Sequence, residues 1–169
     1  MLIYLDSNIV QYCADYEQFI FGDDDHPPTV NENLQRELVA LRRLVELDQM
    51  ASWTTAASPQ LVAELFAGKP RSHQKRAFRV LLQAFHESEF GEDSAVDAQH
   101  VKEIERRYAH LHLSDKDLCH LAQAIVLHAC WFLTNDYGIL KRCENASLPL
   151  RVSKVSDCLQ DFSVGLFLK

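Results

Sequence analysis

The sequence predicts a three-layer α/β/α sandwich with a central, mainly parallel sheet, and three observations support this fold class. Short apolar segments typical of buried strands alternate with longer segments whose apolar residues recur at helical spacing. Such alternation favours parallel strands joined by helical crossovers. The 169 residues contain no repeat or low-complexity tract, and a chain of this size buries roughly 70% of its unfolded surface. We therefore expect a single domain spanning residues 1–169.

The first half of the chain is expected to contain two strands and three helices. Leu2–Leu5 is an apolar strand ended by Asp6, and residues 8–17 form a short helix. The acidic segment 22–28 contains two prolines and is expected to be a mobile loop. A helix with one buried stripe and a short strand at residues 52–55 follow, and Ser58 and Pro59 then begin another helix, which Gly68 and Pro70 end. The buried stripe consists of Leu34, Leu38, Leu41 and Val45.

The second half is expected to contain three helices and two strands. The apolar residues of two amphipathic helices are Phe78, Leu81, Leu82 and Phe85, then Val101, Ile104, Tyr108 and Leu111. Ser114 opens a third helix with Leu118, Leu121, Ala122 and Ile125 on one face. That helix leads to the strand Trp131–Leu133, and residues 148–152 supply a last short strand. Residues 164–169 are assigned to no element.

Composition favours a reduced, cytoplasmic protein. The five cysteines are odd in number and form no C-x-x-C pair, which argues against a disulfide framework or a zinc knuckle. No basic region precedes the first apolar residues and Asp6 interrupts them early, so no signal peptide is expected. The longest apolar stretch, residues 118–133, is broken by polar residues and is shorter than the roughly 18 residues of a membrane span. We expect no membrane association.

Four carboxylates lie where apolar segments begin, end or turn polar. Asp6 and Asp136 follow expected strands, whereas Glu64 and Asp117 lie in expected helices. Open α/β sheets bind ligands beyond the carboxyl ends of their parallel strands, so the four acids can meet there. Such a pocket would suit the hard divalent cations Mg²⁺ or Mn²⁺. The net charge of −7 argues weakly against broad nucleic-acid binding, but bound cations would neutralise the acids locally.

Each acid also has a purely structural explanation. Asp6 can cap the following helix, and Asp117 can belong to a capping box with Ser114, in which case Asp115 can exchange roles with it. Glu64 can face solvent, although its apolar neighbours predict that it finds a partner. Asp136 can belong to a polar turn. Any one acid is readily explained in this way, but all four together are less so.

Four segments resemble the signature segments of PIN-domain nucleases. They are residues 4–9, 62–65, 117–124 and 133–136, each containing one of the four acids. Their order and approximate spacing also match, and the resemblance extends from about residue 2 to residue 152. Asn8 and Thr134 are similar to PIN positions that steady the metal-binding acids. The segment 19–29 is longer than the corresponding segment in small members of the family, and its role is open.

The resemblance implies a metal-dependent endoribonuclease, often the toxin of a VapBC-type toxin–antitoxin pair. Asp6, Glu64, Asp117 and Asp136 would hold Mg²⁺ or Mn²⁺ directly or through water. Such ions orient a phosphodiester, activate water for in-line attack and stabilise the leaving oxygen. The product would carry a 5′-phosphate. The implied partners are an RNA substrate, an antitoxin protein and a second copy of the chain in a homodimer.

Two further clusters of side chains have competing interpretations. A basic run following Glu64 can contact an RNA backbone or simply form a solvated face. It consists of Lys69, Arg71, Lys75, Arg76 and Arg79. His110 and His112 can suggest a transition-metal site, but a helix-end histidine pair is the simpler interpretation.

Alternative functions were weighed against the nuclease. A haloacid-dehalogenase-like phosphatase needs a second aspartate two residues after the first, where this chain has Asn8. A receiver domain needs paired early acids and a late lysine, and neither is clear. A catalytically silent PIN-fold module that binds RNA or protein stays open, as does a structure-specific DNA nuclease. The compact chain favours RNA, but the sequence identifies neither the target nor the number of metal ions.

Overall fold

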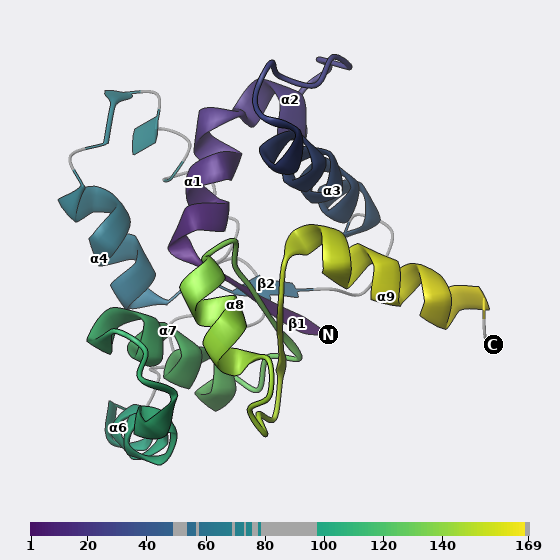
Figure 1. The fold of residues 1–169 in the computed structure, drawn as a ribbon. Coiled ribbons are helices and arrows are strands. Elements are labelled where there is room, and N and C mark those ends of the chain that lie inside the picture. Colours follow the sequence, from purple (N-terminus) through teal and green to yellow (C-terminus); the bar gives the residue numbers. More distant parts are fainter. Residues whose placement is uncertain are drawn as a thin grey trace.

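A four-stranded, fully parallel sheet forms the centre of the protein (Figure 1). The computed structural model describes residues 1–48, 54–56, 58–68, 70–72, 74–75, 78 and 98–167. The strands are β1 (Leu2–Leu5), β2 (Thr54–Ala56), β3 (Trp131–Leu133) and β4 (Arg151–Ser153), in the spatial order β2-β1-β3-β4. Each neighbouring pair is parallel. The predicted α/β class with a central parallel sheet is confirmed.

Helices cover both faces of the sheet because successive strand residues point to opposite sides. Ile3 and Leu5 belong to one buried cluster, whereas Tyr4 between them belongs to the other. On β3, Trp131 and Leu133 likewise belong to the first cluster, and Phe132 between them belongs to the second. The sheet therefore lies between two apolar cores, as a three-layer sandwich requires.

The first core is formed by α1 (Ser7–Asp15), α2 (Glu17–Phe21), α3 (Glu32–Asp48), α4 (Pro59–Ala67) and α9 (Val155–Phe167). Figure 1 shows α3 and α9 side by side, and residues of the two helices are in close contact. The second core is formed by α6 (Ala98–Tyr108), the 3₁₀ turn η1 (Ala109–Leu111), α7 (Asp115–Val126) and α8 (Tyr137–Cys143). No helix among the described residues is long and apolar enough to cross a membrane.

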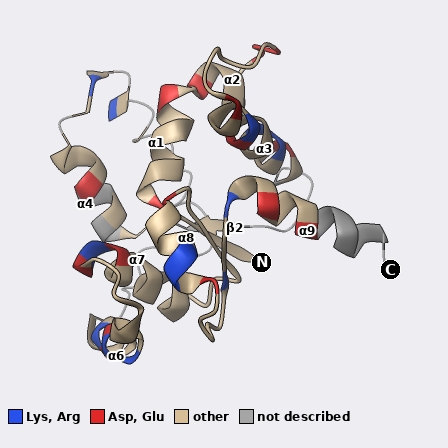
Figure 2. Ribbon diagram, viewed as in Figure 1, with Lys and Arg blue, Asp and Glu red and all other residues tan. Residues whose placement is uncertain are grey.

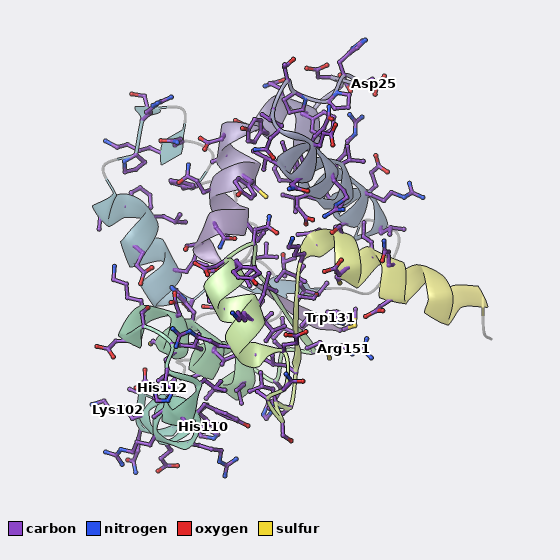
Figure 3. The ribbon with its side chains drawn as sticks, in the orientation of Figure 1. Asp25, Lys102, His110, His112, Trp131 and Arg151 are labelled. Carbon is purple, nitrogen blue, oxygen red and sulfur yellow. The ribbon has the colours of Figure 1, made fainter. Side chains whose placement is uncertain are left out.

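Several element boundaries differ from those predicted. The expected helix 8–17 is divided at Tyr16 into α1 and α2, and α2 buries Phe19 and Ile20. The segment 19–29 is therefore partly helical rather than one loop. Irregular chain begins at Gly22, and Asp25 projects from its outer tip (Figure 3). The mobility predicted for this loop remains a prediction.

Two helices were missed and one prediction lies largely outside the described residues. The turn after β3 continues into α8, and the chain end forms α9. The expected strand 52–55 is β2 at 54–56, with residues 52 and 53 undescribed. Of the expected helix around residues 78–85, Phe78 is described and fully buried. β4 begins at Arg151, three residues later than predicted, where the first ladder hydrogen bond reaches the Cys130 carbonyl (2.9 Å).

Candidate active site at the carboxyl edge of the sheet

Asp6 lies where the chain leaves β1 and enters α1. Its backbone N–H donates to the Leu133 carbonyl of β3 (3.0 Å), and only 4% of the residue is exposed. Oδ1 of its carboxylate accepts a hydrogen bond from the Ser7 N–H (2.7 Å), which makes Asp6 the N-cap of α1. The structural role considered for Asp6 is therefore present. Helix capping accounts for the contacts of Oδ1, but it does not account for those of Oδ2.

Two polar side chains hold Oδ2 of Asp6. Asn8 donates from Nδ2 (2.7 Å) and Thr134 donates from Oγ1 (2.6 Å). Asn8 Nδ2 also lies 3.1 Å from Thr134 Oγ1, and Thr134 is completely buried. Hydrogen bonds to a charged acceptor are short and strong, so the position of this carboxylate is fixed from both α1 and the end of β3. The two residues singled out beside the acids thus contact Asp6 directly.

Burial raises the pKa of Asp6 above its ordinary value, because a charged carboxylate loses hydration in the interior. The hydrogen bonds from Thr134 and the Ser7 N–H oppose this rise, as would a positive charge on His120, whereas the negative charge of Asp117 adds to it. Within the described part of the chain, no Lys or Arg forms an ion pair with Asp6. A cation beside Asp6 would favour its ionised form and relieve the repulsion from Asp117.

Asp136 is exposed and caps α8. Its Oδ1 accepts hydrogen bonds from the N–H groups of Gly138 (2.6 Å) and Ile139 (3.1 Å). Its own N–H donates to Thr134 Oγ1 (3.0 Å), so one buried hydroxyl contacts both the Asp6 carboxylate and the backbone of Asp136. The expected polar turn is thus also a helix start. Thr134 connects the two acids that follow strands.

Asp117 belongs to the first turn of α7. Ser114 caps this helix by accepting from the Asp117 N–H (3.2 Å), and its hydroxyl donates back to Asp117 Oδ2 (2.7 Å). The reciprocal contact resembles the capping box that was considered, and Asp117 is half-buried while Asp115 is exposed. Its charge nonetheless acts on buried Asp6. Asp117, rather than Asp115, is therefore the acid of this turn that interacts with Asp6.

Glu64 meets a histidine rather than solvent alone. Its side chain is 21% exposed, and Oε2 lies 3.2 Å from Nε2 of His120, which is 2% exposed. The expectation that an acid among apolar neighbours finds a partner is confirmed. Because His120 is three residues after Asp117 on α7, this contact brings α4 against the helix that contains Asp117.

A buried polar network behind His120 was missed by sequence reasoning. The Tyr4 hydroxyl lies 3.1 Å from His120 Nδ1, 2.7 Å from Ser58 Oγ and 3.2 Å from Gln123 Oε1. In the tautomer protonated on Nε2, His120 donates to Glu64, and its Nδ1 accepts from Tyr4. His120 and Gln123 are polar residues one turn apart within the apolar part of α7, residues 118–126, and that spacing is the signal that could have revealed the network.

The four acids are only partly assembled. The charge of Asp117 raises the pKa of Asp6, Thr134 contacts both Asp6 and the backbone of Asp136, and Glu64 approaches α7 through His120. Among the described residues, no three His, Cys, Asp or Glu side chains form a group that could hold a metal ion. The chemistry of the donors fits a hard cation, and Mg²⁺ typically keeps several waters and needs only one or two protein carboxylates. The four-acid ligand set remains a prediction.

The described basic candidates lie away from Asp6. Arg71 and Lys75 are exposed, and Gln74 between them donates to Asp15 Oδ1 at the end of α1 (2.6 Å). Figure 2 shows Lys and Arg positions, in blue, in the described chain that follows α4. Asp6 caps the opposite end of this nine-residue helix, which is about 14 Å long at 1.5 Å per residue. Lys69, Arg76 and Arg79 lie outside the described residues. An RNA contact by this run remains a prediction.

His110 and His112 are located at the end of α6 and η1 (Figure 3). His110 Nδ1 lies 3.0 Å from the Arg107 carbonyl oxygen, and His112 adopts a left-handed conformation that ends η1. The Arg142 guanidinium donates to the His112 carbonyl. These contacts are those of a helix end.

Comparison with known proteins supports the fold. Neither a family model nor the sequence of a curated protein matches the chain. The structure is similar to that of VapBC2 from Rickettsia felis bound to a DNA fragment from its promoter, with a TM-score of 0.59 and 18% identity. The alignment covers 91% of this chain and 98% of the other. At this identity the likeness shows a shared PIN-like fold, as the signature segments predicted.

Proposed function

We propose that this protein is a Mg²⁺- or Mn²⁺-dependent endoribonuclease. The observation that best supports the proposal is the buried Asp6 carboxylate at the carboxyl edge of the sheet, raised in pKa by burial and by the charge of Asp117. A protein gains nothing in stability from a desolvated acid close to a second acid. A cation that binds both would turn this repulsion into attraction, which gives the arrangement a purpose.

The chain's own residues would prepare the site in two ways. Thr134 and Asn8 orient Oδ2 of Asp6, and Ser114 orients Oδ2 of Asp117, so neither carboxylate must reorganise when a cation binds. His120 orients Glu64 through Nε2 while Tyr4 holds the opposite ring nitrogen. When bound, the metal would supply charge stabilisation and activation of water for phosphodiester hydrolysis. Asp6 and Asp117 would be the first ligands, because the charge of Asp117 acts on Asp6, and Glu64 and Asp136 would complete the set directly or through water.

A cleavage assay with matched variants tests this proposal. Purified protein is incubated with a mixed pool of structured RNA in Mg²⁺, Mn²⁺ or EDTA. We expect metal-dependent products ending in a 5′-phosphate, abolished in Asp6→Asn and Asp117→Asn. Asp115→Asn is the matched control, because it removes the same charge from the same helical turn at an exposed position. Loss of cleavage in Asp115→Asn but not in Asp117→Asn would contradict the assigned ligands.

Two outcomes would favour the alternative functions. Cleavage of branched or flapped DNA in preference to RNA would indicate a structure-specific DNA nuclease. Absence of cleavage, together with absence of Mn²⁺ binding by calorimetry, would indicate a silent module with a PIN-like fold.

We further propose that the protein is the toxin of a VapBC-type pair, cytoplasmic and neutralised by an antitoxin. The supporting observation is that the structure resembles a chain from a VapBC2 complex over 91% of its length. The test is co-expression with the product of an adjacent small reading frame that has a DNA-binding N-terminus. We expect a stable complex in which RNA cleavage is suppressed. Growth arrest on expression of the protein alone, relieved by co-expression, would support the pair, and unaffected growth would argue for a solitary RNA-processing enzyme. Size-exclusion chromatography with light scattering tests the expected homodimer.

A further inference from the structure

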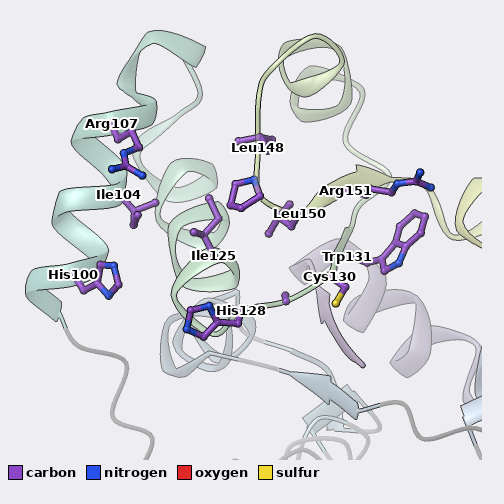
Figure 4. A pocket seen from close by; sticks show the side chains of 12 residues that line it. His100, Ile104, Arg107, Ile125, His128, Cys130, Trp131, Leu148, Leu150 and Arg151 are labelled. Carbon is purple, nitrogen blue, oxygen red and sulfur yellow. The ribbon is translucent and has the colours of Figure 1, made fainter.

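A second candidate site lies at the opposite, amino edge of the sheet. A basin of about 750 Å³ opens between α6, the end of α7 and the segment 148–150 (Figure 4). Its lining includes Trp131 and Arg151, the first residues of β3 and β4, whereas Asp6 and Asp136 of the acidic site come after the carboxyl ends of β1 and β3. Small-molecule sites typically enclose about 300–1,000 Å³. The basin is therefore of ligand size and separate from the acidic site.

The described lining of the basin carries positive charge in an acidic protein. Arg107 and Arg151 supply this charge beside His100 and His128, and no Asp or Glu is among the described residues that line the basin, although the chain has a net charge of −7. Arg107 forms no ion pair within the described part of the chain. Arg151, at the rim, is already engaged, because it pairs with Asp161 (2.7 Å) and its guanidinium carbon lies 5.2 Å from the centre of the Trp131 ring. Arg107 is thus the cation available to an anionic ligand.

The polar side chains of the basin lie at its two ends, and apolar side chains lie between them. Figure 4 shows the His100 and His128 rings at one end and Arg107 toward the other, with Ile104 and Ile125 between them. His100 and Arg107 are seven residues apart on α6, about 10 Å along the axis at 1.5 Å per residue. An extended ligand with an anionic group at one end and a flat polar ring at the other matches this spacing.

His128 follows the C-terminal end of α7. Its φ of 56° is left-handed, a conformation common where helices end and one that histidine adopts more readily than most residues. The turn is tight, with His128 N–H donating to the Ile125 carbonyl (2.9 Å) and the next N–H donating to the Ala124 carbonyl (2.9 Å). Histidine adds to this turn an imidazole that faces the basin and can either donate or accept a hydrogen bond.

We propose that this basin binds a nucleoside monophosphate. The Arg107 guanidinium donates to the phosphate, a geometry that its planar fork favours. The ribose and base cover Ile104 and Ile125, and the two imidazoles hydrogen-bond the edge of the base. The proposal uses no residue of the acidic site and stands whether or not the protein cleaves RNA.

Calorimetry in EDTA tests the proposal, because chelation keeps phosphate groups from binding metal at the acidic site. The probes are AMP, GMP, CMP and UMP, with adenosine and inorganic phosphate as partial ligands. We expect at least one nucleotide to bind tenfold or more tightly than either partial ligand. The ring signals of His100 and His128 in NMR spectra should shift in the same titration. If no nucleotide binds more tightly than phosphate, or if neither histidine signal moves, the proposal is wrong.

Matched variants localise the binding. Arg107→Gln should weaken the best nucleotide by tenfold or more, while Arg106→Gln should not change it. Arg106 is the neighbouring residue of α6 with the same charge, and it faces a different hollow together with Glu103. His128→Asn, which preserves a residue that tolerates the left-handed backbone, should weaken nucleotide binding and leave phosphate binding unchanged. Equal effects of Arg107→Gln and Arg106→Gln would overturn the assignment, with circular dichroism verifying that each variant is folded.

Discussion

Replacing Thr134 by valine tests how the candidate active site is held together. Valine preserves the shape of this fully buried side chain and removes only the hydroxyl. The variant loses the hydrogen bond donated to Asp6 Oδ2 (2.6 Å) and those accepted from the Asp136 N–H (3.0 Å) and from Asn8 Nδ2 (3.1 Å), although Asn8 keeps its bond to Asp6. A bond to a charged group contributes about 1.5–3 kcal/mol and a neutral bond about 1 kcal/mol. We therefore expect Thr134→Val to lower the free energy of unfolding by about 3 kcal/mol, or the melting temperature by about 10 °C.

The assay is urea unfolding followed by circular dichroism in EDTA, with Thr134→Ser as the control. Serine keeps the hydroxyl and removes one methyl group, so it should cost about 1 kcal/mol. The Thr134 hydrogen bond lowers the pKa of Asp6, so the valine variant should bind a proton at higher pH than the parent. Its extra destabilisation should therefore be largest at neutral pH and shrink as the pH falls through the pKa of Asp6. If valine were no more costly than serine at pH 7, the structural role assigned to this hydroxyl would be refuted.

Four further predictions follow from the same contacts. Tyr4→Phe should lower the free energy of unfolding by about 1–3 kcal/mol, because buried His120 Nδ1 and Gln123 Oε1 lose their contact with the Tyr4 hydroxyl. Tyr137→Phe, at a residue 73% exposed, should have almost no effect in the same melt. Ser114→Ala should cost about 1 kcal/mol through loss of the α7 cap, measured by chemical denaturation. Mn²⁺ at about 100 times its dissociation constant should add about 2.7 kcal/mol, or roughly 5–10 °C, in differential scanning fluorimetry, and a similar gain in Asp6→Asn would argue against this ligand. Because burial raises the Asp6 pKa above its unfolded value, ionised Asp6 destabilises the metal-free fold; stability should rise as the pH falls through the folded pKa, and Asp6→Asn should weaken this dependence in a pH series of melts.

Local sequence signals were sufficient where one short segment determines the structure. Ser58 accepts from the Leu61 N–H (3.2 Å) and begins α4 as predicted, because a capping hydroxyl acts within one helical turn. The strands Leu2–Leu5 and Trp131–Leu133 were identified by their continuous apolar character, typical of strands buried on both faces. The helix α3 was predicted from an apolar stripe at helical spacing, which is also a local pattern.

Two helices were missed, one with a local start signal and one that contacts a distant partner. Asp136 was considered as part of a polar turn, and in the structure it caps the backbone N–H groups that follow and begins α8. The chain end, unassigned from the sequence, forms α9, whose Ser156 N–H and hydroxyl both donate to buried Glu37 of α3 (3.2 and 2.6 Å). The cap of α8 is thus a local signal, whereas no local pattern around Ser156 identifies Glu37, 119 positions away, as its partner.

The sequence by itself determined which chemistry is available: four acids at the ends of apolar segments, with Asn8 and Thr134 close to two of them in the chain. Their order was enough to predict a PIN-like fold. Only the tertiary structure decided how these groups interact, since hydrogen bonds and electrostatic coupling depend on distances between residues more than 100 positions apart. It placed Thr134 on Asp6, joined Glu64 to His120, and placed the described basic residues Arg71 and Lys75 at the far end of α1. It also formed the cationic basin at the opposite edge, whose lining residues come from elements that have no common sequence pattern.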